Sequence, residues 1–321
     1  TWGLLGDGRT AVIEMAAASG LTLVPEERRD PMVTTTYGTG ELIRAALDAG
    51  RRHLIIGIGG SATTDAGAGM AQAIGVRLLD AEGREIGRGG GELGRLVNIQ
   101  MSEADPRLAE SEIRVACDVD NPLYGERGAA YVYGPQKGAS PEAVRILDAN
   151  LRRFADVVER DLGLDVRELP GAGAAGGLGA GLVAFCGASL EPGVEIVIDA
   201  TRLPEKMRGA SLCLTGEGRI DGQTGFGKTP AGVAGVAVRE GVPVIALGGS
   251  VSLEATYLHQ RGFDALAAIA NGPMTLAEAL EPDRARSLIG FTAEQMVRCF
   301  LAGRRAAAGS PTSAKDDGGC T

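Results

Sequence analysis

The stretch His53-Leu-Ile-Ile-Gly-Ile-Gly-Gly-Ser-Ala-Thr-Thr-Asp65 is the part of this chain that says most about its fold. Its first half is a short apolar run of the kind that forms a buried strand in a parallel sheet. Its second half is a glycine loop that carries hydroxyl and carboxylate side chains. Because glycine has no Cβ, backbone N–H groups in such a loop can approach an anionic ligand closely. We therefore expect a buried strand that ends in an anion-binding loop.

Glycine accounts for 50 of the 321 residues, and much of it lies in three runs at 57–69, 171–181 and 216–227. The first and third runs follow strand-like apolar segments, whereas the second opens a helix-like segment of small residues. The patterns predict strands at 11–15, 53–59, 113–117, 212–215, 242–247 and 263–269, and helices at 40–49, 66–74, 141–162, 229–240 and 288–301. This alternation of strands and helices predicts an α/β fold with parallel sheets.

The clearest helix signal lies at 141–162. Ser140 can cap its N-terminus, Pro141 suits the first helical position, and Gly163 can end the helix. Apolar residues recur at spacings of three and four between Val144 and Leu162, which predicts one buried face.

The bulk composition argues against several classes of protein. The net charge of −9 argues against a nucleic-acid partner, which a basic surface would bind. Five cysteines form no C-x-x-C pair and only two histidines are present, so we expect a reducing cytoplasm and no zinc site. No run of 18 apolar residues and no signal-peptide pattern occurs, so we expect neither a membrane span nor a membrane partner.

Two glycine motifs match known nucleotide signatures. Residues 57–62 fit the dinucleotide pattern G-x-G-x-x-A, with Asp80 about twenty residues further on. A dinucleotide turn does not need the hydroxyl and carboxylate cluster that follows, and this weakens the match. Residues 222–229 fit G-x-x-x-x-G-K-[ST] literally. The predicted strand at 212–215 ends about seven residues before that motif, so we expect Lys228 to meet a phosphate by a route other than a true P-loop.

Four polar loops follow predicted strands or occupy tight turns. They are the segments 61–65, 118–121, 136–137 and 217–221. In open α/β sheets, ligands bind outside the carboxyl ends of the strands. Carboxylates there can hold Mg²⁺ or accept a proton from a hydroxyl, and Lys or Arg can neutralise a transferring phosphoryl group. Any one of these loops could be a helix cap or a solvated turn, but four together favour a phosphate-handling site.

At these residues the chain resembles the bacterial type-I glycerate kinase family. The order and spacing of the matching runs extend over roughly residues 1–300. The runs are Ala11-Val-Ile-Glu-Met-Ala-Ala-Ala-Ser-Gly-Leu21, Thr35-Thr-Tyr-Gly-Thr-Gly-Glu-Leu42, Gly59-Gly-Ser-Ala-Thr-Thr-Asp-Ala-Gly-Ala-Gly69, Cys117-Asp-Val-Asp-Asn-Pro-Leu123, Gly134-Pro-Gln-Lys-Gly138, Pro170-Gly-Ala-Gly-Ala-Ala-Gly-Gly-Leu178 and Thr215-Gly-Glu-Gly-Arg-Ile-Asp-Gly-Gln-Thr224.

The resemblance implies ATP- and Mg²⁺-dependent phosphorylation of D-glycerate, which gives 2- or 3-phosphoglycerate. It also implies two α/β domains and no P-loop fold. Residues 1–205 would form a restriction-enzyme-like domain, residues 206–303 part of a flavodoxin-like domain, and residues 304–321 a disordered tail. The family usually begins with an Asp-Ser-Phe-Lys run and later carries Asp-Gly-Gly-Glu-Gly. Neither is present here, so about seventy residues of the family pattern, and part of the flavodoxin-like domain, are expected to be missing.

The polar loops supply the expected site residues. Asp65 or Asp118 would orient the substrate hydroxyl or act as its base. An anion would be bound by Gly59, Gly60, Ser61 and Thr63, and phosphate or the glycerate carboxylate would be contacted by Lys137, Arg219 and Lys228. Mg²⁺ would be bound by Asp120 and Asp221. Glu217 would be a further carboxylate on the cofactor side. An NAD-linked oxidoreductase and an inactive ligand-binding fragment remain as alternatives.

Overall fold

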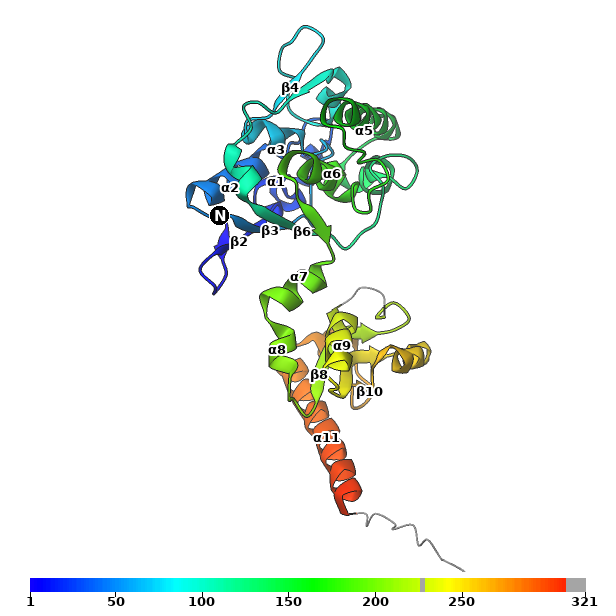
Figure 1. Ribbon diagram of the computed structural model, residues 1–321. Helices are drawn as coiled ribbons and strands as arrows, with labels where there is room; N and C mark the ends of the chain where they lie inside the picture. The colour runs from blue at the N-terminus through cyan, green and yellow to red at the C-terminus, as the bar shows by residue number, and fades with distance from the viewer. Residues whose placement is uncertain (226–228, 310–321) are drawn as a thin grey trace, which may run out of the picture. The chain divides into compact units, whose positions relative to one another are not determined.

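The structure is a computed structural model that describes residues 1–225 and 229–309 (Figure 1). The chain divides into two compact units, Thr1–Ile196 and a second unit that begins at Val197. The division falls within α7 (Gly193–Ala200), earlier than the boundary expected after residue 205. The residues just before the expected boundary form α8 (Leu203–Met207), because Pro204 lies in the first turn, where a helix tolerates proline.

Unit 1 is built on a five-stranded sheet with the order β1-β2-β3-β6-β7 (Figure 1). Its strands are β1 (Gly3–Leu4), β2 (Thr10–Glu14), β3 (His53–Gly57), β6 (Glu112–Ala116) and β7 (Ser189–Glu191). All neighbours are parallel except β1 and β2. The register aligns Ile13, Ile56 and Val115, which are fully buried. It therefore also aligns the carboxyl ends of the three central strands, and the polar loops that follow two of them begin side by side.

The helices of unit 1 cover this sheet and build the surroundings of those loops. They are α1 (Ala16–Ser19), α2 (Tyr37–Asp48), α3 (Ala68–Ala73), α4 (Ala129–Tyr133), α5 (Pro141–Leu162) and α6 (Ala174–Cys186). Short 3-10 turns lie at η1 (Leu21–Leu23), η2 (Glu26–Arg28), η3 (Gly90–Arg95), η4 (Pro106–Glu110) and η5 (Pro135–Lys137), and β4 (Arg77–Leu79) pairs with β5 (Asn98–Gln100). The strands and helices expected in this part of the chain are confirmed to within a few residues.

Helix α5 confirms the strongest local prediction. The Ser140 hydroxyl accepts a hydrogen bond from the Ala143 N–H at 3.2 Å, and Gly163 ends the helix with φ of +69°. Its apolar face is buried, and Phe154 meets Phe185 of α6 edge-on with 5.9 Å between ring centroids. Capping and periodicity are local properties, so the sequence alone was sufficient here.

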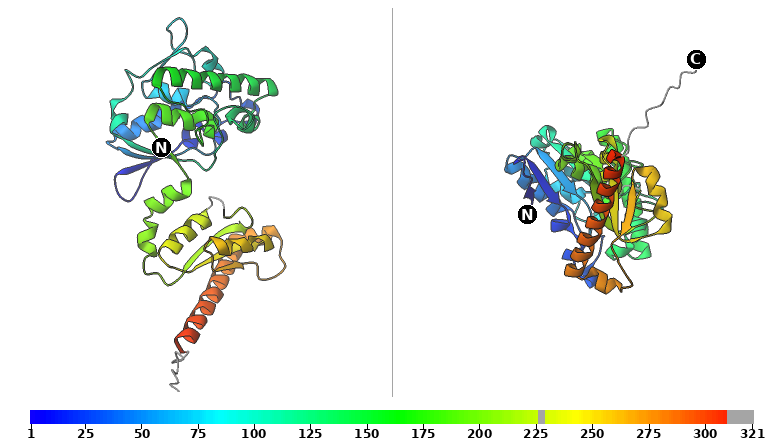
Figure 2. Two further views of the ribbon diagram at one scale, coloured as in Figure 1. Left: turned by 45° about the vertical axis from the view of Figure 1, so that its right-hand side comes forward. Right: turned by 90° about the horizontal axis from the view of Figure 1, so that it is seen from below.

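Unit 2 contains a three-stranded parallel sheet with the order β10-β9-β8. Its strands are β8 (Cys213–Ile220), β9 (Val244–Val251) and β10 (Ala265–Ala268), and its remaining elements are α9 (Thr229–Arg239), η6 (Leu253–Arg261), α10 (Leu276–Leu280) and α11 (Pro282–Gly309). Helix α9 packs on β8 and β9, and α11 contacts β9 (Figure 2). The expected α/β class is thus confirmed in both units.

Two expectations in unit 2 are corrected. Strand β8 extends to Ile220 because its parallel pairing continues through Glu217 with Gly248 and Ile220 with Val251. The argument that a strand ends seven residues before the Gly222 motif is therefore wrong, although residues 226–228 of that motif, Lys228 included, lie outside the described residues.

The second correction concerns the first six residues of the expected disordered tail. Residues 304–309 continue helix α11, because Arg and Ala are strong helix formers. The rest of that tail, residues 310–321, lies outside the described residues. Among the described residues, no helix is long and apolar enough to cross a membrane.

Candidate active site

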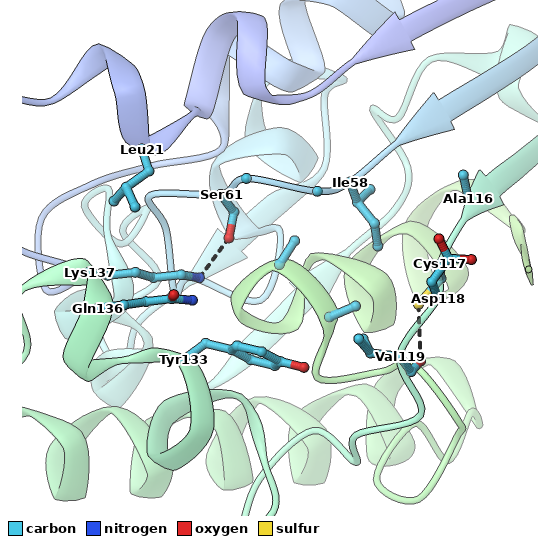
Figure 3. A pocket seen from close by; sticks show the side chains of 14 residues that line it. Leu21, Ile58, Ser61, Ala116, Cys117, Asp118, Val119, Tyr133, Gln136 and Lys137 are labelled. Atoms are coloured by element: carbon cyan, nitrogen blue, oxygen red, sulfur yellow. Dashed lines mark hydrogen bonds between the residues drawn. The ribbon is translucent and has the colours of Figure 1, made fainter. Parts of the chain in front are cut away.

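A cavity of about 380 Å³ lies in unit 1 at the carboxyl ends of β3 and β6 (Figure 3). Its walls come from the loops after these two strands, from the end of α4 with η5, and from the start of α6. The lining residues are Leu21, Ile58, Gly59, Gly60, Ser61, Ala116, Cys117, Asp118, Val119, Tyr133, Gln136, Lys137, Ala174 and Ala175. The cavity thus joins three of the expected polar loops with the start of the second glycine run.

Lys137 is the buried cation of this cavity. Its side chain is only 2% exposed, and its Nζ donates to the Ser61 hydroxyl and to the Thr63 carbonyl, both at 2.6 Å (Figure 3). Burial lowers the pKa of Lys137 to about 7, and the negative charge of Asp65 opposes this shift. The charge of Lys137 therefore changes near neutral pH, which makes the residue sensitive to any anion that enters the cavity.

Asp118 lies across the cavity from Lys137 (Figure 3). It is exposed, and its Oδ1 accepts a hydrogen bond from the Gly193 N–H at 2.8 Å. Gly193 is the first residue of helix α7, so its N–H has a defined position. The hydrogen bond to this N–H therefore fixes the direction of the Asp118 carboxylate. Asp120, two residues further along the same loop, is also exposed but does not line the cavity.

Asp65 points into the protein and does not line the cavity. It is fully buried, and its Oδ2 accepts from the backbone N–H of Thr36 at 2.8 Å and from the Thr36 hydroxyl at 2.9 Å. The N–H groups of Gly67 and Gly69 complete its shell at 3.3 Å. Burial raises the pKa of Asp65, and these four hydrogen bonds oppose the shift. The carboxylate therefore ties the start of α2 to the start of α3.

The glycine loop after β3 is fastened on both sides. Gly60 has φ of +72°, a conformation that favours glycine, and its carbonyl accepts from the Leu21 N–H at 2.8 Å. Ser61 forms an isolated antiparallel bridge with Gly20. Thr63, expected to bind an anion, is 1% exposed and lies outside the lining. Its carbonyl accepts from Lys137, and its hydroxyl has no hydrogen-bond partner within the described residues.

Tyr133 is a cavity residue that the sequence analysis missed. Its hydroxyl donates to Asn121 Oδ1 at 2.6 Å, and the Asn121 carbonyl accepts from the Gly173 N–H at 3.0 Å. Burial raises the pKa of Tyr133, with a smaller contribution from Cys117. The spacing of four residues between Tyr133 and Lys137 corresponds to one helical turn and could have indicated a shared face.

The glycine run at 171–181 allows close packing between the start of α6 and the neighbouring loops. A Cβ on Gly173 would lie 2.2 Å from the Pro122 carbonyl oxygen, and one on Gly176 would lie 1.9 Å from the Thr63 carbonyl oxygen. Only glycine allows the start of α6 to touch the loops after both β3 and β6. The run therefore holds the walls of the cavity together.

We expect Gly176→Ala to lower the free energy of unfolding by about 3 kcal/mol or more, because the new methyl group overlaps a backbone oxygen and φ is +72°. Gly187→Ala is the matched control, since Gly187 has φ of +61° but nothing within 4 Å of a Cβ; its loss should be about 1 kcal/mol. Urea denaturation would measure both. Equal losses for the two variants would contradict the packing role.

The other expected site residues lie in unit 2. Glu217 receives a hydrogen bond from the Thr224 hydroxyl, and Arg219 pairs with Asp221 at 3.3 Å. Glu217 also lines a largely apolar cavity of about 880 Å³ between the carboxyl ends of β8 and β9 and the helices α10 and α11, whereas Arg219 and Asp221 do not. Residues 1–225 and 229–309 contain no group of three His, Cys, Asp or Glu side chains placed to hold a metal ion.

The loop after β3 differs from a dinucleotide turn. In that turn the glycines lead directly into a helix, whose N-terminus meets the pyrophosphate. Here the loop continues through Ser61 and Asp65, and α3 begins only at Ala68. The Asp80 carboxylate is also not placed to bind a ribose hydroxyl, because it pairs with Arg95 at 2.8 Å and with Arg84 at 3.2 Å. The dinucleotide interpretation therefore lacks its structural context.

An α/β sheet with an exposed aspartate after one strand, and a buried lysine from η5 in the same cavity, is typical of an enzyme site that binds a small anionic molecule. The glycerate kinase family model matches residues 1–301 of this chain. The chain belongs to the glycerate kinase family.

Individual relatives agree with this assignment. The chain is 56% identical over 280 residues to a glycerate kinase of Halalkalibacterium halodurans. That alignment covers 87% of this chain and 74% of the relative. The chain is 55% identical over 279 residues to a glycerate 2-kinase of Escherichia coli, covering 87% and 73%. A crystal structure from Salmonella typhimurium LT2, described as a glycerate kinase 2, matches with a TM-score of 0.83 and 52% identity, covering 95% of this chain and 79% of that one.

Proposed function

We propose that Asp118, Lys137 and Ser61 carry the chemistry of this chain. The chain is an ATP-dependent kinase of glycerate, as its family and its relatives of 55% identity indicate. The observation that carries the residue assignment is the cavity of unit 1, where buried Lys137 faces exposed Asp118 (Figure 3). The substrate we assign to this cavity is D-glycerate, with 2- or 3-phosphoglycerate as the product.

Asp118 acts on the substrate hydroxyl. It orients the hydroxyl and accepts its proton while the oxygen forms a bond to the γ-phosphorus of ATP and ADP leaves. Phosphoryl transfer depends on positioning and charge neutralisation more than on covalent chemistry, so one directed carboxylate is sufficient on the acceptor side. Lys137 and Ser61 hold an anionic group of the substrate on the opposite wall.

Asp65 takes a positioning role in place of the base role considered for it. Its four hydrogen bonds all go to the chain itself, and it opposes the loss of charge on Lys137. Thr63 likewise supports Lys137 through its carbonyl. Gly59 and Gly60 remain the backbone of the cavity wall that can face an anion.

The carboxylates present fit a magnesium ion that arrives with the nucleotide. Mg²⁺ keeps several waters and binds one or two carboxylates together with substrate phosphates, so it needs no complete protein cage. Within unit 1 the exposed carboxylate of Asp120 is our candidate ligand, and within unit 2 the carboxylate of Asp221 is our candidate ligand. The ion would neutralise charge on the phosphates, as would Arg219 and Lys228.

We also propose a family-type domain for each of the two units. Unit 1, with its mixed five-stranded sheet, corresponds to the restriction-enzyme-like domain. Unit 2, with three parallel strands, corresponds to part of the flavodoxin-like domain. The resemblance to the family also implies a fold other than that of P-loop enzymes.

Asp65→Asn tests the positioning role of that residue. The amide retains one acceptor oxygen and brings an NH₂ group against the Thr36 and glycine N–H donors, so we expect the free energy of unfolding to fall by about 3 kcal/mol. Asp120→Asn, at an exposed site, should change it by less than about 0.5 kcal/mol. Unchanged stability with a large loss of kcat would return the base role to Asp65.

A coupled assay of ADP release with ATP, Mg²⁺ and D-glycerate tests the function. We expect turnover with D-glycerate, none with glycerol, and no absorbance change when NADH replaces ATP. Turnover of glycerol at the rate of glycerate would contradict the assignment of an acid substrate. Thermal stabilisation by glycerate without ADP release would instead support the ligand-binding alternative.

A further inference from the structure

The start of α6 reverses its handedness at the wall of the cavity. Gly173 is right-handed, with φ of −76° and ψ of −11°, whereas Ala175 is left-handed, with φ of +54° and ψ of +36°. Gly176 and Gly177 continue the left-handed turn. Such a reversal turns successive backbone N–H groups toward one side and creates a concave arrangement that binds anions.

Two N–H groups in this turn have no acceptor. The Ala174 N–H donates to the Gly171 carbonyl at 3.0 Å, and the Gly177 N–H donates to the Gly173 carbonyl at 3.3 Å. Between them, the N–H groups of Ala175 and Gly176 meet no acceptor within residues 1–225 and 229–309. Ala174 and Ala175 line the cavity. Gly176 is buried and Ala175 is half-buried. Since buried backbone donors are almost always paired, a bound molecule or water is the expected partner.

Lys137 provides an independent observation in the same cavity. An ammonium group has three N–H donors, and those of Lys137 reach Ser61 and the Thr63 carbonyl, with no third acceptor in the described part of the chain. The side chain is 2% exposed and points into the cavity (Figure 3). The same Thr63 carbonyl oxygen lies 1.9 Å from the Cβ position of Gly176. The unpaired ammonium donor and the left-handed turn are therefore close neighbours.

We infer that the N–H groups of Ala175 and Gly176, together with the third N–H of Lys137, form the subsite for the carboxylate of glycerate. This inference rests on the function proposed above and names the part of the substrate that each wall takes. The carboxylate receives charge-assisted hydrogen bonds from these donors, while the hydroxyl that is phosphorylated lies toward Asp118. A cavity of about 380 Å³ suits a three-carbon acid. The subsite selects an acid over the neutral molecule of the same shape.

Replacing Ala175 with lactic acid tests the subsite, because it changes the N–H of that residue to an ester oxygen and leaves the side chain intact. We expect the affinity for D-glycerate, measured by isothermal titration calorimetry, to fall about 10-fold or more. Affinity for glyceramide and glycerol, which lack the anion, should stay within about twofold. Lys137→Met should weaken D-glycerate about 10-fold or more, whereas Lys206→Met, at an exposed lysine, should have no effect.

The same replacement at Ala174 is the matched control, since that N–H is already bonded to Gly171. It should lower the melting temperature without selecting against the acid. Unchanged D-glycerate affinity in the Ala175 ester would overturn the subsite and leave the kinase function in place. Selective weakening of inorganic phosphate would assign the donors to a phosphoryl group and also overturn it. Absence of D-glycerate binding by the unmodified chain would refute the proposed function together with the subsite.

Discussion

Lys137→Met is expected to lower kcat/KM for glycerate by about 10³-fold, the effect of removing one buried charge-stabilising donor from an active site. Methionine keeps the apolar stem of the lysine, so the walls of the cavity should persist. The substitution removes the only lysine or arginine side chain that, among the described residues, lines the cavity of unit 1. Steady-state ADP release would measure it, with Lys206→Met as the control for the loss of a positive charge.

The pH profile provides a second test of Lys137. Its pKa of about 7 means that the charge is present below pH 7 and is lost as the pH rises through 7. We therefore expect kcat/KM of the free enzyme to fall above about pH 7, and the Lys137→Met variant to lack this limb. A profile that is the same in both proteins would remove Lys137 from the chemistry.

The same pKa predicts a stability effect of opposite sign. The ordinary pKa of lysine is 10.5, so between pH 7 and 10.5 the unfolded chain binds a proton at Lys137 that the folded chain does not. The free energy of unfolding should therefore rise with pH in this window, by at most about 1.4 kcal/mol per pH unit. Urea denaturation of the wild type and of Lys137→Met would give this slope as a difference between the two proteins.

Asp118→Asn is expected to lower kcat by about 10²- to 10⁴-fold with little change in KM, because the amide cannot accept the hydroxyl proton. The amide oxygen can still accept from the Gly193 N–H, so the start of α7 should remain in place. Asp120→Asn is the matched control in the same loop, and its effect should appear as a higher Mg²⁺ concentration needed for half-maximal rate. Near-normal turnover by Asp118→Asn would show that another group takes the proton.

The local parts of the fold were predictable from sequence patterns. Helix α5 was expected with its cap at Ser140 and its end at Gly163, and the structure agrees. The buried strand at β3 and the loop after it were expected from one apolar run and the glycines that follow. The predicted length of strand β8 was too short. Its second half contains glycine and charged residues, and it is extended because it pairs with β9.

The candidate site was only partly predictable. Ser61, Asp118 and Lys137 were expected and do line one cavity, together with Gly59 and Gly60. Asp65 was expected beside them, yet its carboxylate turns inward to Thr36 and the N–H groups at the start of α3. Nothing in the local pattern distinguishes an aspartate that faces a ligand from one that ties two helices together, because the difference lies in which distant donors surround it.

The sequence by itself determined the α/β class, the positions of most strands and helices, and the family, because these depend on periodicity, capping and the order of motifs along the chain. Only the tertiary structure decided the properties of individual site residues. The hydrogen bond between Lys137 and Ser61 joins positions 76 residues apart, and the pKa of Lys137 depends on the burial that this contact requires. Desolvation and long-range hydrogen bonding arise only when the chain is folded, so a local sequence pattern cannot predict them.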